Sequence, residues 1–328
     1  MNVAVAPSAG ADLMLQMRPL PELAPGDVLV QVRAAGINPL DGKIRAAQAG
    51  HAQQPLPSTL GIDMAGVVVA VAPDVTSFAV GDDVFGMVGG VGGNQGTIAE
   101  YIAADARLLA IKPAALSWQE AAVLPLVFIT AWEGLVDRAK VKAGDKVLVH
   151  GGAGGVGHVA IQIAKAFGAE VWATGTAAQR GVIEQLGANA IDYEAETLED
   201  YVARATDGEG FDVVYDTVGG KTIDVSFAAA RVYTGHVVTS LGWGTHSLAP
   251  LSFRGATYSG VFTLLPLLTG KGRRHHGEIM MAAAKLAADG RLRPLLAPQS
   301  FSLAEANEAF EQMASRDNVG KVAITVSA

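Results

Sequence analysis

A glycine-rich segment at residues 150–157 carries the strongest chemical signal in the sequence. Its glycines Gly152, Gly154 and Gly157 form the pattern G-x-G-x-x-G after a hydrophobic run and before an amphipathic stretch. The first glycine permits a tight turn, the second lets the backbone approach a pyrophosphate, and the third allows a helix to pack closely on a strand. Free N–H groups at Gly155-Val156 and the helix dipole favour phosphate. A dinucleotide site is therefore predicted here; the alternative is a plain glycine-rich turn.

The end of the next predicted strand bears on which dinucleotide binds. Enzymes that use NAD place an Asp or Glu there, about 20 residues beyond the glycines, to bind the ribose 2′-hydroxyl. This chain instead has Thr174, Gly175 and Thr176, and Arg180 follows. A guanidinium pairs with a 2′-phosphate that a carboxylate would repel, so the pattern favours NADPH. Tyr193, which ends the third strand segment, is a further candidate; the alternative for Arg180 is a solvated position at a helix start.

The composition excludes several functional classes. The chain has 328 residues, of which 50% are hydrophobic and 17% charged, and it has no cysteine. This length suggests about two domains, and the hydrophobicity argues against disorder. Without cysteine there is no disulfide, iron–sulfur cluster, thiol nucleophile or thiolate zinc site. A net charge of −8, with no run of basic residues, argues against nucleic acid or an anionic membrane as the main partner.

No targeting or membrane-spanning segment stands out. The most apolar stretches, Val123–Ile129 and Val261–Leu268, each contain a proline and are far shorter than the roughly 20 residues that span a bilayer. The N-terminus lacks the basic and apolar regions of a secretory signal. We therefore expect a cytoplasmic protein.

Two kinds of periodicity divide the chain. Residues 25–110 contain short strands of period two between Gly/Pro turns, which indicate a compact β-rich unit. From about residue 117, strands and helices alternate, which predicts a parallel, doubly wound sheet with a ligand crevice at the carboxyl ends of its strands. A final strand is expected to rejoin the N-terminal unit. The expected strands are 146–150, 170–174, 211–216, 232–240, 256–261 and 320–326, and the expected domains are 1–121, 122–264 and 265–328.

The motifs, taken in order, resemble those of the medium-chain dehydrogenase/reductase superfamily, specifically its zinc-free quinone oxidoreductase (zeta-crystallin-like) branch. The resemblance runs over nearly the whole chain. It implies an α/β protein with a GroES-like, β-rich catalytic domain, a Rossmann domain with a doubly wound parallel sheet, and a cofactor cleft between them. Besides the glycine motif, it is carried by Gly36-Ile37-Asn38-Pro39-Leu40-Asp41, Leu60-Gly61-Ile62-Asp63-Met64-Ala65-Gly66, Phe78-x-x-Gly81-Asp82-x-Val84, Ala99-Glu100-Tyr101, Leu124-Pro125, Thr130-Ala131-Trp132, Asp216-Thr217-Val218-Gly219-Gly220 and Gly320-Lys321.

The departures from the zinc-dependent relatives define the expected chemistry. Asn38 stands where those enzymes carry a catalytic Cys, Ile62-Asp63 stands where they carry a His-Glu pair, and their four-Cys lobe is missing. Catalytic zinc needs about three protein ligands, so no metal is expected. Without a Lewis acid, we expect hydride transfer from NADPH to an electron-poor acceptor, either a quinone or an α,β-unsaturated carbonyl.

The resemblance also implies catalytic residues. Asn38 would offer hydrogen bonds near the nicotinamide or the acceptor oxygen, with Asp41 and Lys43 beside it. Lys43 would stabilise a developing oxyanion or donate a proton; its alternative is an exposed loop lysine. Asp63 is a further candidate, whose alternative is a turn-capping residue.

On the cofactor side, the resemblance implies that Thr130 lies behind the nicotinamide ring; its alternative is a helix cap. The segments Val218-Gly219 and Ser240-Leu241-Gly242 follow predicted strands, so they should flank the cofactor. Lys321, in the closing Gly-Lys pair, is included among the cofactor-binding candidates.

Other functions remain open. Among enzymes, the alternatives are an enoyl or acrylate-type reductase and a reductase of a specialised ketone. In a different class, the chain would be a nucleotide-binding protein with little turnover. The expected partners are a small-molecule substrate and a second copy of the chain, because relatives dimerise through an edge strand of the nucleotide domain, here Thr257–Val261, which is apolar enough to need cover.

Overall fold

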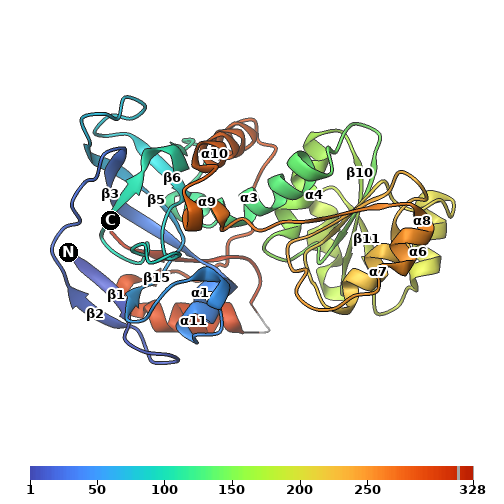
Figure 1. Ribbon diagram of the computed structural model, residues 1–328, viewed down its shortest axis with the longest axis horizontal. Helices are drawn as coiled ribbons and strands as arrows, with labels where there is room; N and C mark the ends of the chain where they lie inside the picture. The colour runs from blue at the N-terminus through green and yellow to red at the C-terminus, as the bar shows by residue number, and fades with distance from the viewer. Residues whose placement is uncertain (316–317, 328) are drawn as a thin grey trace. The chain divides into compact units, whose positions relative to one another are not determined.

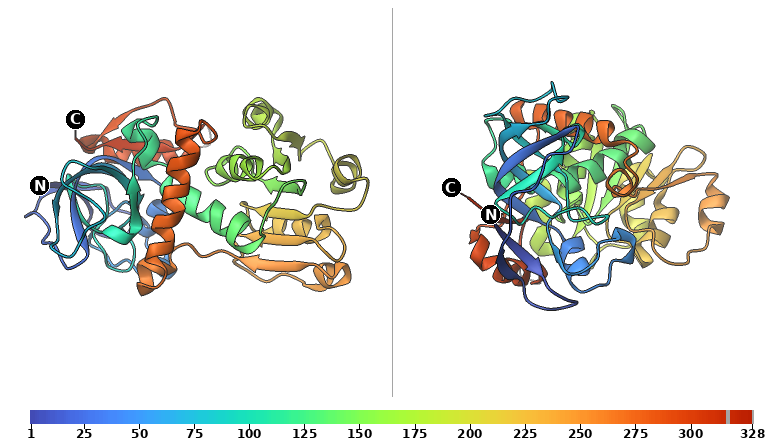
Figure 2. Two further views of the ribbon diagram at one scale, coloured as in Figure 1. Left: turned by 90° about the horizontal axis from the view of Figure 1, so that it is seen from above. Right: turned by 60° about the vertical axis from the view of Figure 1, so that its left-hand side comes forward.

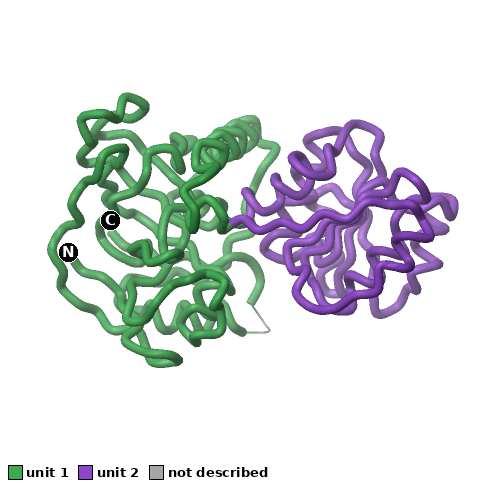
Figure 3. The backbone as a smooth tube through the Cα atoms, viewed as in Figure 1, with its two compact units in different colours: residues 1–126, 264–328 green, residues 127–263 purple. Residues whose placement is uncertain are grey.

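The computed structural model describes residues 1–315 and 318–327, which form two compact units. Unit 1 comprises Met1–Leu126 and Leu264–Ala328, and unit 2 comprises Val127–Thr263 (Figure 3). Helix α3 (Pro125–Trp132) begins in the first unit and continues into the second. Each unit is described by itself below.

Unit 1 is built on strand β3 (Asp27–Ile37), whose alternating Val28, Val30 and Val32 are fully buried. This strand pairs antiparallel with β5, β7 and β16 in a seven-stranded sheet, and a second sheet has the order β2-β1-β4 (Figure 1). The remaining strands of the unit are β1 (Asn2–Ala6), β2 (Met14–Met17), β4 (Ser58–Thr59), β5 (Asp63–Val71), β6 (Asp83–Met87), β7 (Tyr101–Asp105), β8 (Leu109–Ile111), β15 (Phe301–Ser302) and β16 (Val322–Thr325).

Helices cover parts of this β-rich unit. The 16-residue helix α10 (Arg273–Ala288) packs against β8 and against η2, the short helix that precedes β8 (Figure 2). Its Gly277 is required there, because a Cβ would lie 2.4 Å from the carbonyl oxygen of Arg107. The other helices of unit 1 are α1 (Pro39–Arg45), η1 (Gly50–Ala52), η2 (Ala106–Leu108), α2 (Trp118–Ala122), α9 (Leu265–Thr269), η5 (Leu303–Glu305) and α11 (Ala306–Ala314).

Unit 2 contains a six-stranded parallel sheet in the order β11-β10-β9-β12-β13-β14. Taken in chain order this is 3-2-1-4-5-6, the doubly wound arrangement of dinucleotide-binding folds, so the predicted α/β fold class is confirmed. Its strands are β9 (Lys146–His150), β10 (Glu170–Gly175), β11 (Asn189–Asp192), β12 (Val213–Asp216), β13 (His236–Thr239) and β14 (Thr257–Gly260). Its helices are η3 (Glu133–Arg138), α4 (Gly157–Ala166), η4 (Ala177–Gln179), α5 (Arg180–Gln185), α6 (Leu198–Thr206), α7 (Lys221–Ala229) and α8 (Ala249–Arg254).

The strand expected at 232–240 is shorter in the structure. Strand β13 begins only at His236, because Tyr233 has a positive φ of 69° and residues 232–234 form a turn. The N-terminal strands β1 and β2 were not expected from the sequence. In the part of the chain that the structure describes, no helix is both long enough and apolar enough to cross a bilayer.

Candidate active site

Four of the predicted site residues form one buried cluster in unit 1. Asn38, Asp41 and Asp63 are completely buried, and Lys321 is only 6% exposed. The Asn38 side-chain amide donates to Asp63 Oδ2 at 2.9 Å, and its backbone N–H donates to Asp41 Oδ2 at 2.8 Å. Lys321 Nζ donates to Asn38 Oδ1 and to the carbonyl oxygen of Ile37, the latter at 3.0 Å.

Three strands bring these residues together. Asn38 follows β3 as the N-cap residue of α1, and Asp63 begins β5, which is registered with β3. Lys321 lies just before β16, whose Val322 pairs with Ile37. Sheet register therefore places an ammonium and two carboxyl groups around one asparagine, although the chain segments are far apart in sequence.

Burial dominates the electrostatics of the cluster. Desolvation raises the pKa of both Asp41 and Asp63 from 3.8 to about 7, although the Lys321 charge and hydrogen bonds partly oppose this rise. Desolvation also lowers the pKa of Lys321, while the two carboxylates oppose that shift. One ammonium facing two carboxyl groups is electrically balanced when one carboxyl group keeps its proton, which is the state that their high pKa values favour near neutral pH.

The hydrogen bonds and burial of the cluster limit which of its side chains can contact solvent or a substrate. The Asn38 side chain uses its oxygen toward Lys321 and its nitrogen toward Asp63, and it is not exposed. Lys43, in contrast, is exposed on helix α1. Among the four predicted catalytic residues, Lys43 is therefore the one accessible from solvent in the structure. The catalytic roles of all four, and a role of Lys321 toward the cofactor, stay predictions.

The donor groups do not suit catalytic zinc. Asn38 and Asp63 are joined to each other by a hydrogen bond, Asp63 Oδ1 accepts the backbone N–H of Leu126 at 3.0 Å, and Lys321 already supplies a cation. Residues 1–315 and 318–327 contain no group of three His, Asp or Glu side chains that could hold a metal ion. These positions therefore lack the three N, S or O ligands that zinc needs.

The glycine motif of unit 2 forms a tight cradle between β9 and α4. A Cβ on Gly157 would lie 2.1 Å from the carbonyl oxygen of Gly151, and one on Gly152 would lie 2.6 Å from the Cβ of Ala173. A side chain at either position would therefore collide with backbone or core. The cradle ends at the N-terminus of a ten-residue helix, where dipole and N–H groups favour an anion, so these residues suit the pyrophosphate of a dinucleotide.

The predicted adenosine-side residues differ in their burial and in their contacts. The Thr174 hydroxyl is 5% exposed and accepts the Gly151 N–H at 3.1 Å, so it joins β10 to the glycine motif. Thr176 precedes η4, and Arg180 begins α5, where its half-exposed guanidinium lies 3.5 Å from Glu184. Tyr193 follows β11 and is exposed.

Thr130 belongs to a polar network that sequence reasoning missed. Its Oγ1 lies 3.1 Å from Thr263 Oγ1, and the Thr263 hydroxyl donates to Glu133 Oε2 at 3.2 Å. The buried Tyr215 hydroxyl donates to the Thr130 carbonyl oxygen at 2.7 Å. Gly134 makes room for that ring, because a Cβ there would lie 2.8 Å from Tyr215 Cζ. Nothing in the sequence pattern signals that residues 130 and 263 meet.

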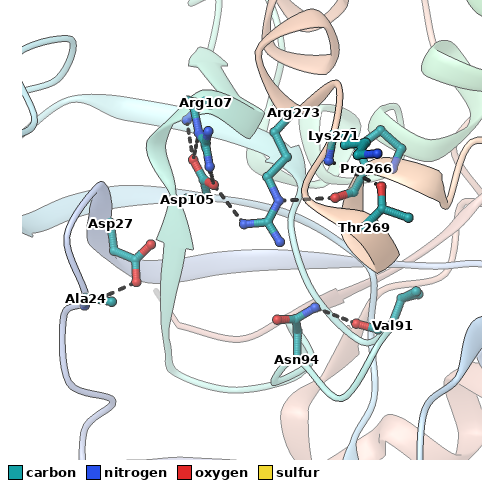
Figure 4. Close-up of polar contacts among 10 residues, drawn as sticks. All are labelled: Ala24, Asp27, Val91, Asn94, Asp105, Arg107, Pro266, Thr269, Lys271 and Arg273. Atoms are coloured by element: carbon teal, nitrogen blue, oxygen red, sulfur yellow. Dashed lines mark hydrogen bonds and ion pairs between the residues drawn. The ribbon is translucent and has the colours of Figure 1, made fainter.

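A second unpredicted polar cluster anchors α10 in unit 1 (Figure 4). The Asp105 carboxylate accepts a bidentate pair of hydrogen bonds from the Arg107 guanidinium, at 2.9 and 2.6 Å, and one at 2.8 Å from Arg273. Arg273 also donates to the carbonyl oxygen of Pro266 in α9 at 3.1 Å. These arginines hold the pKa of Asp105 at about 2, although burial opposes the shift. The cluster therefore fixes α9 and the start of α10 on the strand β7.

Sequence comparison identifies families for both parts of the chain. Residues 24–114 match the alcohol dehydrogenase GroES-like domain, and residues 186–324 match the zinc-binding dehydrogenase family. The chain is 36% identical over 313 residues to the 2-methylene-furan-3-one reductase of Solanum lycopersicum, covering 93% of this chain and 73% of that protein. It is 35% identical to the spectinabilin polyketide synthase system protein NorB of Streptomyces orinoci, but it spans 98% of its own length and only 14% of that protein.

Solved structures share the fold over the whole chain. An alcohol dehydrogenase superfamily protein from Novosphingobium aromaticivorans has 56% identity and a TM-score of 0.98, with complete coverage of both chains. The quinone oxidoreductase from Coxiella burnetii has 30% identity and a TM-score of 0.84, covering 100% of this chain and 99% of that chain. The CurK enoyl reductase has 28% identity and a TM-score of 0.84, with 99% coverage of both. With its GroES-like unit and its Rossmann unit, the chain belongs to the medium-chain dehydrogenase/reductase superfamily of oxidoreductases.

Proposed function

We propose that this protein is a zinc-independent reductase that transfers hydride from NADPH to a quinone or an α,β-unsaturated carbonyl. The observation that carries the proposal is the Asn38–Asp63–Lys321 cluster, in which Asn38 and Asp63 stand where the zinc-dependent relatives carry a Cys and part of a His-Glu pair, and Lys321 donates to Asn38. Because no Lewis acid ligand set is available there, an acceptor must already be electron-poor. The relatives named as a furanone reductase and a quinone oxidoreductase act on acceptors of that kind.

The reduced nicotinamide supplies the hydride when it is bound. The glycine cradle at Gly152–Gly157 would hold the pyrophosphate, and Thr130, whose hydroxyl lies 3.1 Å from that of Thr263, would support the nicotinamide ring. The reduced acceptor becomes an enolate or hydroquinone anion, which takes a proton from water or from exposed Lys43. In unit 1, a cavity of about 470 Å³ beside α1, lined by Ile44, Ala47, Ala49, Gly50, Gln53, Gln54 and Pro55, would take the hydrocarbon part of the acceptor.

The preference for NADPH rests on the end of β10. Strand β10 ends at Gly175 and is followed by Thr176, neither of which is a carboxylate, and Arg180 stands at the start of α5 within the same short segment. A guanidinium there can pair with the 2′-phosphate, whereas its present partner Glu184 is 3.5 Å away at the surface, where such pairs are weak.

A homodimer through β14 is part of this proposal. Strand β14 is an edge of the six-stranded sheet, and Tyr258 is partly exposed on it. An unpaired edge of this kind invites pairing with another strand. Light scattering at micromolar concentration should give twice the chain mass of 33.7 kDa, and a monomer would contradict dimerisation.

An enoyl thioester reductase is the second candidate. It is favoured by the similarity to a polyketide synthase segment and to the CurK enoyl reductase. The acceptor panel should therefore contain 1,4-benzoquinone, 9,10-phenanthrenequinone, an alkenal and an enoyl thioester, with NADPH oxidation followed by absorbance and with NADH and chelator controls. Turnover that prefers NADPH and is insensitive to chelator supports the proposal, and the best acceptor identifies the subclass. Tight NADPH binding without turnover on any acceptor would support a nucleotide-binding protein instead.

A further inference from the structure

Four buried polar side chains form a row across the carboxyl end of the parallel sheet in unit 2. Strand register pairs Asp216 of β12 with His150 of β9 and with Thr239 of β13. On the other side, β10 and β9 pair at Ala173 and Val149, so Thr174 is level with His150. Registered residues of a parallel sheet share a face. The exposed fractions are 5% for Thr174, 3% for His150, 1% for Thr239 and zero for Asp216.

Three of the four members of this row, Thr174, Asp216 and Thr239, accept a backbone N–H of a loop that follows a strand. Thr174 Oγ1 accepts from Gly151 N–H, the first residue of the glycine loop, at 3.1 Å. Asp216 Oδ1 accepts from two backbone N–H groups, those of Val218 at 2.8 Å and Gly219 at 3.0 Å. Thr239 Oγ1 likewise accepts the N–H of the second residue after it, at 3.1 Å. The row therefore shapes the three loops at the crevice of the sheet.

Asp216 accepts hydrogen bonds from more backbone N–H groups than Thr174 or Thr239 does. It fixes the turn at Gly219, whose φ is +80°, and a Cβ on Gly219 would lie only 2.8 Å from the Cβ of Leu241. The turn after β12 and the loop after β13 are therefore in close contact, so Asp216, which holds the turn, also affects the loop that packs on it. Burial raises the pKa of Asp216, because desolvation disfavours its ionised form. Keeping this acceptor in the buried position therefore costs free energy.

We propose that Asp216 is a positioning residue for the nicotinamide half of the cofactor, acting through the Val218-Gly219 turn and the Leu241 loop. This inference rests on the proposed dinucleotide binding. In the 3-2-1-4-5-6 arrangement, the glycine loop after β9 takes the pyrophosphate, and the strands β12 and β13 lie on the side of β9 opposite the adenosine-side strand β10. Loss of the Asp216 acceptor should therefore weaken contacts to the nicotinamide half and leave the adenosine half unaffected.

The test compares two ligands on matched variants of the full chain. Asp216→Leu removes the Oδ1 acceptor of both N–H groups while keeping a side chain of the same branching, whereas Asp216→Asn retains a carbonyl oxygen that can accept both bonds. We expect Asp216→Leu to raise the NADPH dissociation constant at least about tenfold and leave that of 2′,5′-ADP within about twofold. Asp216→Asn should restore NADPH binding to within about threefold. Ser226→Ala, which removes a buried hydroxyl within α7 of the same unit, is the control and should change neither constant.

Every outcome decides between the interpretations. Unchanged NADPH binding in Asp216→Leu, equal weakening of both ligands, or failure of Asp216→Asn to restore binding would each overturn the positioning role. If Asp216→Leu does not fold, Gly219→Ala disturbs the same turn from above and should give the same selective loss. If the wild-type chain binds neither NADPH nor 2′,5′-ADP, the proposed function itself fails, which is distinct from these results.

Discussion

Replacing Lys321 by Met should destabilise the protein in a strongly pH-dependent way. Methionine has a similar length but no charge, so Asp41 and Asp63 would lose the Lys321 ammonium that faces them in their buried cluster. Asn38 would also lose the ammonium that its side-chain oxygen accepts from. Removing one partner of a buried ion pair costs about 3–5 kcal/mol, because an uncompensated charge remains in a medium of low polarity.

The magnitude should grow with pH. In the wild type, both carboxyl groups have a pKa near 7, above the unfolded value of 3.8, so the wild-type free energy of unfolding already falls as pH rises from about 4 through 7. The Lys321 charge lowers both pKa values, so they should rise further in Lys321→Met. Above pH 7, Asp41 and Asp63 together then hold up to about one proton more in the native variant than in the native wild type. Its relative stability should fall by up to about 1.4 kcal/mol per pH unit in that range.

Urea unfolding at pH 6, 7, 8 and 9 measures this dependence directly. Lys285→Met is the matched control, because Lys285 is exposed on α10 and pairs with exposed Asp289. The variant Asp41→Asn/Lys321→Met should regain part of the stability at pH 8, since it removes one of the two carboxyl groups. A loss in Lys321→Met that is independent of pH, or no larger than the loss in Lys285→Met, would refute the reasoning.

Two predictions concern the nucleotide site. Gly157→Ala should raise the NADPH dissociation constant at least about tenfold, because the new Cβ would lie 2.1 Å from the Gly151 oxygen. Gly181→Ala is the control, because a Cβ there meets nothing within 4 Å. It should leave NADPH binding unchanged and stabilise α5 by about 0.5–1 kcal/mol. Equal behaviour of the two alanine variants would contradict the cradle. Arg180→Gln should reduce the ratio of NADPH to NADH affinity about tenfold, with little change in NADH affinity. Binding titrations with both nucleotides measure this ratio. An unchanged ratio would show that residues other than Arg180 recognise the 2′-phosphate.

Local patterns explain why the nucleotide unit was predictable. The glycine motif needs only a strand, a turn and a helix that are adjacent in sequence, and β9 with α4 forms these within 146–166. The alternation of strands and helices also predicts parallel pairing, because each crossover helix returns the chain in the same direction. Strand ends were less predictable: the turn at Tyr233 shortens β13, although the apolar pattern continues through it.

Contacts set by strand register were beyond reach of the sequence. Lys321 and Asn38 are 283 residues apart, and only the pairing of β16 with β3 brings them together. Likewise, the row through His150 and Asp216 depends on a register that a shift of one residue would destroy, because it would turn each side chain to the other face. Both clusters are therefore products of tertiary structure, although every member is visible as a polar residue near a strand end.

The buried cluster of unit 1 gives the sequence departures from zinc relatives a common physical basis. Asn38 donates to Asp63 and accepts from Lys321, so the protein's own ammonium balances the carboxyl groups in this site. An ammonium that is enclosed and already donates to Ile37 and Asn38 stabilises the fold, but it is not placed to polarise an acceptor oxygen. In the proposed function, activation therefore resides in the acceptor itself, as in a quinone or an enone. A saturated ketone or an alcohol, which needs polarisation by the site, should for this reason be a poor substrate.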